Sequence, residues 1–356
     1  TGSSAEKGRC ALQTKKKALF NVSFLLVVFG LTVYGVFHGE DLGAMAEAIR
    51  SSQIKWLIPG VCLVVFFIWG ESIIIWYMMR SFGIRLKKRI CFLFSSVGFF
   101  FSCITPSASG GQPMQIYYMK KEKIPIPVST VILMVVTITY KLVLVVIGLG
   151  ILIFGRGFLH MYLEGILPVY YLGLTLNVFC VAFMTILVFH PVMAEDMLLK
   201  GMDLLERMRL MKRKEARRQK LKDSMEVYRE TAAYLKEHKK VLFHVIVLTF
   251  LQRIALFSVT WFVYLAFRMH GTSFLNVILL QAVISVAVDM LPLPGGMGIS
   301  ETLFLNIFAT VFPGVLLPAM VLSRGLGYYS QLLISALFTV VTQIYYSINT
   351  NEEDGL

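Results

Sequence analysis

Thr105-Pro106-Ser107-Ala108-Ser109-Gly110-Gly111-Gln112-Pro113 interrupts an apolar stretch in the first half of the sequence, and Pro292-Leu293-Pro294-Gly295-Gly296-Met297-Gly298 interrupts another in the second half. We call residues 105–113 the first break and residues 292–298 the second break. Inside a bilayer every backbone N–H and C=O group needs a partner, so such interruptions survive only where the chain is buried in protein or lines a polar cavity. A matched pair of broken segments in the two halves of a chain is typical of the binding site of a membrane transporter.

The composition around the breaks is that of a membrane protein. Of the 356 residues, 57% are hydrophobic and only 15% are charged, whereas a soluble domain carries about 25% charged residues. The apolar residues also fall in long blocks instead of an amphipathic pattern. These features predict an all-α polytopic membrane protein.

A helix needs about 20 apolar residues to cross a bilayer. Six stretches meet this length and are predicted to cross fully: residues 18–37, 56–79, 127–154, 167–189, 241–267 and 317–348. The apolar pieces beside the two breaks are shorter and are predicted to form two broken-helix units, residues 90–123 and 274–312. The predicted organisation is a basic N-terminus (1–17), a first membrane half (18–190), a basic cytoplasmic helical hairpin (191–240), a second membrane half (241–348) and a cytoplasmic tail (349–356).

The distribution of basic residues predicts the topology. The formal net charge is +13, and 27 of the 34 Lys and Arg residues lie in four segments: 1–17, 80–89, 120–123 and 191–240. Basic segments remain on the cytoplasmic side and attract anionic lipid, which accounts for the charge without nucleic acid. All four segments are cytoplasmic only if unit 90–123 enters and leaves from the inside. Unit 274–312 then enters from the outside, so the two re-entrant units have opposite orientations, as in an inverted repeat, and both termini are cytoplasmic.

The first break has the chemistry of an anion site. Ser107 or Ser109 can cap a half-helix, Gly110 and Gly111 let backbone N–H groups approach a ligand, and Pro113 suits a first helical turn. The N-terminus of a helix favours phosphate. The alternative interpretation is an ordinary loop between two short helices.

The second break offers similar groups. Gly295, Gly296 and Gly298 are followed by Ser300 near the expected helix start and Glu301 just inside it. The paired glycines in both breaks favour a matched pair of sites over two unrelated loops.

Six ionisable residues fall within apolar segments: Glu71, Lys141, Arg253, Asp289, Glu301 and Arg324. An isolated charge at mid-bilayer costs about 2.5–3.5 kcal/mol, so these groups are expected to pair or to bind a ligand. In one interpretation, the three basic residues bind the phosphate of a zwitterionic or anionic head group. Arg324 is the preferred ligand, because Tyr328 follows at helical spacing, and Asp289 lies one turn before the second break. The alternative is a set of static buried ion pairs.

Several site classes are not expected. The five cysteines form no CxxC, the six histidines are scattered, and no Walker motif occurs. We therefore expect no metal, no cofactor, no disulfide framework and no ATP hydrolysis.

The first break, followed by Gln115 and Tyr117, resembles the signature of the lysylphosphatidylglycerol synthase transmembrane family. This is the flippase region of the multiple peptide resistance factor of antimicrobial resistance. The second break with Glu301 resembles a second signature, and Arg324 resembles a family arginine. The resemblance implies movement of an aminoacylated phosphatidylglycerol, or of another phospho- or glycolipid, between the leaflets of a bacterial inner membrane. Only residues 349–356 follow the last predicted span, so no aminoacyltransferase domain is expected.

The leading hypothesis is therefore a flippase-like lipid transporter without catalytic residues. An integral-membrane enzyme acting on a lipid head group is one alternative, with Glu71 or Asp289 and Glu301 as carboxylates. A transporter of a soluble solute is another, and a homodimer is left open. The predicted substrate-binding residues are Ser107, Ser109, Gly110, Gly111, Gln112, Gln115, Lys141, Arg253, Asp289, Gly295, Gly296, Gly298, Glu301, Arg324 and Tyr328.

Overall fold

The computed structural model describes residues 42–208 and 215–354. The predicted span 18–37 lies outside the described residues, as do the N-terminus 1–17 and part of the basic run in the predicted hairpin. Within the described ranges the chain is predominantly helical and contains no strand, which confirms the all-α prediction.

Five helical stretches are long and apolar enough to cross a membrane, and they match five of the six predicted spans. They are α3 (Ile54–Ser81), α6 (Ile126–Phe154), α8 (Leu167–Phe189), α11 (Lys239–Ala266) and the C-terminal stretch. The last consists of α14 (Leu316–Arg324), a π-helical turn η4 (Gly325–Tyr329) and α15 (Ser330–Asp354). The chain is thus a multi-pass membrane protein.

The first broken unit is a helical hairpin. It consists of α4 (Lys88–Ile104), the 3-10 turn η1 (Pro106–Ala108) and α5 (Gly111–Lys121). The two helices run antiparallel, since Gly98 lies against Gln115 and Gly111 against Ser102. A Cβ on Gly111 would lie 2.7 Å from the Gly98 carbonyl oxygen, so this glycine permits the close approach of the two helices. The chain therefore enters and leaves the unit at the same end.

The second broken unit repeats this plan. Its parts are α12 (Phe274–Val288), the 3-10 turn η3 (Pro294–Gly296) and α13 (Ile299–Ile307). Each 3-10 turn begins with proline and places the next residue in the left-handed region, Ser107 at φ 51° and Gly295 at φ 57°. The backbone thus has the same local shape in both breaks, although serine occupies a position that favours glycine. The opposite orientation of the units across a bilayer stays a prediction.

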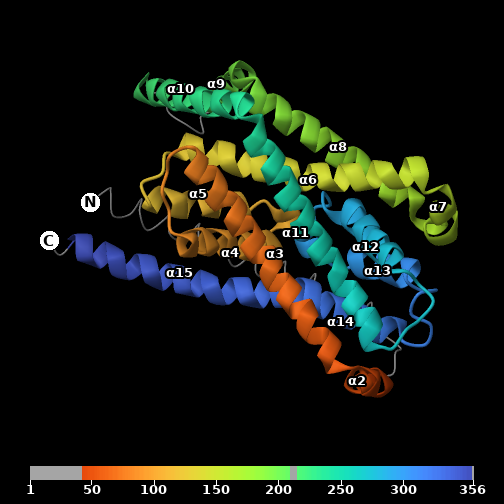
Figure 1. Cartoon of the computed structure of the whole chain (residues 1–356). Helices are drawn as coiled ribbons and strands as arrows, with labels where there is room; N and C mark the ends of the chain where they lie inside the picture. Colours follow the sequence, from red (N-terminus) through yellow and green to blue (C-terminus); the bar gives the residue numbers. More distant parts are fainter. Residues whose placement is uncertain (1–41, 209–214, 355–356) are drawn as a thin grey trace.

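The remaining helices cover the ends of the bundle. They are α2 (Leu42–Ser51), α7 (Arg156–Tyr162), the turn η2 (Glu164–Ile166), α9 (Pro191–Arg207) and α10 (Glu215–Glu237). In Figure 1, α9 and α10 lie together at the end of α8. Helix α10 buries Met225 and Leu235 against the bundle, and Tyr234 Oη donates to the Ser81 carbonyl at 2.7 Å.

The broken units belong to different hydrophobic cores. One cluster holds residues of α4 and α5 with the near ends of α3, α6 and α10, and a second cluster surrounds α12 and α13. A small third cluster, including Phe67, Phe99 and Val259, lies between helices of the two halves. Each unit is therefore held by its own core, and the breaks face each other where the two cores meet.

Candidate functional site

The two breaks are in direct contact, although they are far apart in the sequence. The turns η1 and η3 pack together. Ser107 Oγ donates to the Leu291 carbonyl oxygen at 3.3 Å, and Tyr328 Oη donates to the Cys103 carbonyl oxygen at 3.0 Å. Carbonyl groups left free by the broken helices thus find donors in the other half of the chain, as a low-dielectric environment requires.

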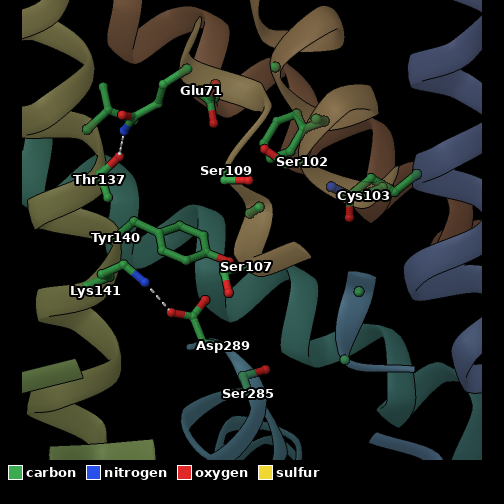
Figure 2. A pocket seen from close by; sticks show the side chains of 18 of the residues that line it. Glu71, Ser102, Cys103, Ser107, Ser109, Thr137, Tyr140, Lys141, Ser285 and Asp289 are labelled. Carbon is green, nitrogen blue, oxygen red and sulfur yellow. Dashed lines mark hydrogen bonds and ion pairs between the residues drawn. The ribbon is translucent and has the colours of Figure 1, made fainter. Parts of the chain in front are cut away.

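A cavity of about 430 Å³ lies at this junction. Most of the predicted site residues line it: Ser107, Ser109, Gln112, Gln115, Lys141, Arg253, Asp289, Gly295, Gly296 and Tyr328. Figure 2 shows polar side chains from both halves pointing toward its centre. Most of the residues that the sequence predicted for one site therefore lie around one cavity in the fold.

Lys141 and Asp289 form an ion pair across the cavity. Lys141 Nζ on α6 lies 2.5 Å from Asp289 Oδ2, and the two side chains are 12% and 14% exposed. Asp289 is the residue that ends α12. The pair neutralises both charges and joins α6 of the first half to the end of α12, just before the second break (Figure 2).

Arg253 on α11 is the most deeply buried charged side chain of the cavity lining, at 2% exposure. Its Cζ atom lies 3.4 Å from the centroid of the Tyr140 ring and 5.4 Å from that of Phe257. Its Nε and Nη2 atoms have no hydrogen-bond partner among the residues of the described ranges. Aromatic faces favour a cation, yet they leave these N–H groups free for an acceptor.

Glu71 on α3 supplies a carboxylate to the same cavity. Gln115 Nε2 donates to Glu71 Oε1 at 2.7 Å. The neighbouring Gln112 donates to Thr137 Oγ1 on α6 and, at 3.4 Å, to the Leu133 carbonyl oxygen. The two glutamines therefore connect α5, the second helix of the first hairpin, to α3 and α6.

The predicted substrate-binding residues did not include Glu71, Thr137 and Tyr140, although all three line the cavity. Glu71 was considered only among the intramembrane charges and as a carboxylate of the alternative enzyme. One signal could have found two of the three. Thr137, Tyr140 and Lys141 follow at helical spacing on an otherwise apolar helix, which places them on one polar face.

Glu301 and Arg324 brace the second break. Arg324 Nε donates to Glu301 Oε1 at 2.8 Å, and Arg324 Nη2 donates to the Gly295 carbonyl at 3.1 Å. Glu301 Oε2 in turn accepts the Gly298 N–H at 2.7 Å, at the start of α13. Arg324 lines a smaller adjoining pocket of about 140 Å³, together with Gly295 and Tyr328. The structure thus gives Arg324 a network of protein partners, and its binding of phosphate stays a prediction.

The glycines of the first break have structural roles. Gly110 immediately precedes α5 and donates its N–H to Thr105 Oγ1 at 2.9 Å, while Gly111 packs inside the hairpin. The expectation that Ser107 or Ser109 caps α5 is wrong, because the N-cap residue is Gly110 and no side-chain cap hydrogen bond forms at this helix within the described ranges. Thr105, which also donates to the Phe101 carbonyl, ends α4 and holds the turn instead.

The cavity has apolar walls around its polar centre. Phe67, Phe99, Leu133, Val136, Met184 and Leu256 also line it. An amphiphile with a polar head group matches this division better than a fully polar solute does. Among the described residues, no group of three or more His, Cys, Asp or Glu side chains could hold a metal ion.

Comparison with known proteins agrees with the two signatures. The family model of the lysylphosphatidylglycerol synthase transmembrane region matches residues 19–335. No curated protein gives a significant match to the chain. The matched range includes both breaks and every residue of the cavity lining. The chain therefore belongs to the lysylphosphatidylglycerol synthase transmembrane-region family, which gives it a lipid-related function in the membrane.

Proposed function

We propose that the protein is a flippase-like transporter that moves a phospholipid, or an aminoacyl- or glycolipid, between membrane leaflets. One observation carries the proposal: the two breaks meet around a cavity with a charged centre and apolar walls. The centre suits a head group that would otherwise lose its hydration in the bilayer, and the walls suit the adjoining part of the lipid. The acyl chains stay in the surrounding membrane.

Movement of one half against the other would open the cavity alternately to the two leaflets. Several contacts join the halves and must change in that step. The Lys141–Asp289 ion pair, the Ser107–Leu291 hydrogen bond and the Tyr328–Cys103 hydrogen bond all cross between the halves. A head group that competes for these partners favours the state in which they are separated.

The proposed location is the bacterial cytoplasmic membrane, with both termini inside. The basic residues of α10 and of the loops before α4 and after α5 support this orientation, because cytoplasmic segments carry an excess of Lys and Arg.

The contacts of the acidic residues favour transport over catalysis. Asp289 is paired with Lys141, and Glu301 with Arg324 and the Gly298 N–H. An enzyme would need a base or nucleophile free to reach the lipid, and these two carboxylates are already engaged. Glu71 remains the carboxylate on which the alternative of an enzyme depends, since only Gln115 donates to it among the described residues.

The test is reconstitution of the full chain into liposomes with head-group-labelled lipids. A membrane-impermeant quencher reports how much label reaches the inner leaflet. We expect translocation of at least one phospholipid, and its loss in Arg253→Gln. The control is Lys222→Gln, an exposed change on α10. Absence of translocation across a broad panel of head groups would refute the proposal, and conversion of a lipid into a new product in detergent would favour an enzyme.

A further inference from the structure

The charges of the cavity do not all cancel within the protein. Lys141 and Asp289 neutralise each other. Arg253 and Glu71 both line the cavity, yet they form no ion pair with each other or with another side chain in the described ranges. The lining therefore contributes one positive and one negative group that remain available to a ligand.

The positive group is built to receive an anion. The Arg253 guanidinium is 2% exposed, stacked on Tyr140, and has Nε and Nη2 without partners among the described residues. A buried charge is tolerated when it is paired and hydrogen-bonded, and the stack alone satisfies neither N–H. Two adjacent guanidinium donors match the oxygens of a phosphodiester.

The negative group, Glu71, lies on α3 beside α5. Glu71 Oε1 accepts one hydrogen bond from Gln115, and no hydrogen bond to Oε2 is found within the described part of the chain. A carboxylate held by an amide donor keeps acceptor sites for a further donor, such as an ammonium group. In the view of Figure 2, Glu71 lies on the opposite side of Tyr140 from the Lys141–Asp289 pair.

We infer that the cavity selects a net-neutral, zwitterionic phospholipid head group, with Arg253 binding the phosphodiester and Glu71 binding a single ammonium. The inference rests on the proposed lipid transport and adds the charge of the substrate. An ethanolamine head group satisfies both residues. A glycerol head group leaves Glu71 unpaired, and a head group with two ammonium groups and one phosphate brings one positive charge without a partner.

The test compares binding of lipids that share short acyl chains and differ only in the head group. Phosphatidylethanolamine, phosphatidylglycerol and lysylphosphatidylglycerol are titrated against the purified full chain in nonionic detergent, with native mass spectrometry as the readout. We expect the ethanolamine lipid to bind about tenfold tighter than either of the others. Equal affinity for all three, or a preference for the anionic or the cationic lipid, would overturn the inference.

Variants at two positions, Glu71 and Arg253, assign the roles. Glu71→Gln should lower the affinity for the ethanolamine lipid to that of the glycerol lipid and leave the glycerol lipid unaffected. Arg253→Gln should weaken both lipids to a similar extent, whereas Arg253→Lys should recover part of the affinity. Glu226→Gln, an exposed change on α10, is the matched control for loss of one carboxylate. An equal loss for both lipids in Glu71→Gln would contradict the assignment of the ammonium.

The binding test and the transport test can refute the charge-selective subsite and the transporter independently of each other. Charge-selective binding without translocation would refute the transporter and keep the subsite. Translocation that ignores head-group charge and is unaltered by Glu71→Gln would refute the subsite and keep the transporter. Thermal unfolding of each variant shows that it is folded, and Arg253→Lys keeps the test valid if Arg253→Gln is unstable.

Discussion

Ser107 and Leu291, 184 residues apart, are joined by a hydrogen bond of 3.3 Å between the Ser107 hydroxyl and the Leu291 carbonyl oxygen. The serine lies in the first break and its acceptor stands just before the second turn. Ser107 adopts the left-handed conformation, which costs on the order of 1 kcal/mol for a residue with a side chain. The strained backbone places the hydroxyl against the opposite break, so the two halves are coupled at the tips of their broken units.

The Lys141–Asp289 ion pair should behave as a unit in stability measurements. Lys141→Met or Asp289→Leu alone leaves a charge that is more than four-fifths buried, and breaking such a pair costs about 3–5 kcal/mol. The double variant leaves no isolated charge and should recover most of that loss. Denaturant unfolding in mixed micelles measures the four proteins of the cycle. Additive losses in the double variant would show that the two charges do not interact.

Gly111→Ala should separate α4 from α5 in the first hairpin and lower the stability of the protein. The new methyl group would lie 2.7 Å from the Gly98 carbonyl oxygen and still closer to Ser102 Oγ, and overpacking of this kind costs about 1–3 kcal/mol. Gly150→Ala is the matched control, because this helical glycine has open space around its Cβ position. It should raise stability by about 0.5–1 kcal/mol. A similar effect of the two changes on thermal unfolding would contradict the close packing of α4 and α5.

The positions of the breaks could be predicted because they follow from local chemistry. Proline and paired glycine interrupt a helix wherever they occur, and an interruption within an apolar stretch needs polar surroundings. Spans could be predicted for the same reason, since their length and composition are local properties. The matched breaks in the two halves also predicted a transporter-like binding site, and the contact of η1 with η3 is consistent with one site formed by both breaks.

The roles of the charged residues could not be predicted in the same way. Arg253 and Arg324 are each a lone arginine in an apolar segment, and the sequence favoured Arg324 as the ligand because Tyr328 follows it at helical spacing. Their difference depends on which residues rotation and packing bring opposite them: Glu301 meets Arg324, whereas Tyr140 meets Arg253. The sequence separations between these partners follow no helical period. The three-dimensional structure is therefore needed to distinguish a structural arginine from a ligand-binding one.

Arg324→Gln should destabilise the protein. The change removes the ion pair with Glu301, whose side chain is 5% exposed, and the hydrogen bond to the Gly295 carbonyl. The isolated Glu301 charge makes a loss of about 3–5 kcal/mol the expected result in denaturant unfolding. Arg324→Lys should recover only part of it, because an ammonium group lacks the planar fork that reaches both acceptors. Unchanged stability together with lost lipid binding would show that Arg324 is a ligand instead.

Arg253→Met should have the opposite effect on stability. This guanidinium has no acidic partner among the described residues, so its removal relieves a desolvation cost and keeps an apolar side chain against Tyr140. We expect stability that is unchanged or higher by about 1 kcal/mol, together with loss of translocation, as is common where a functional site is strained. A loss of several kcal/mol in the same unfolding assay would instead make Arg253 a structural residue.

The opposite orientation of the broken units can be tested by cysteine labelling. Lys120 lies at the end of the first hairpin, His270 lies in the loop before the second, and both residues are exposed. In a background with the native cysteines replaced by serine, Lys120→Cys should react with a membrane-impermeant maleimide only after the membrane is opened. His270→Cys should react in intact cells. Since the entrances of inverted re-entrant units lie on opposite sides of the bilayer, labelling of both cysteines from the same side would contradict the inverted repeat. Protection of both in opened membranes would place these loops in the bilayer and contradict it equally.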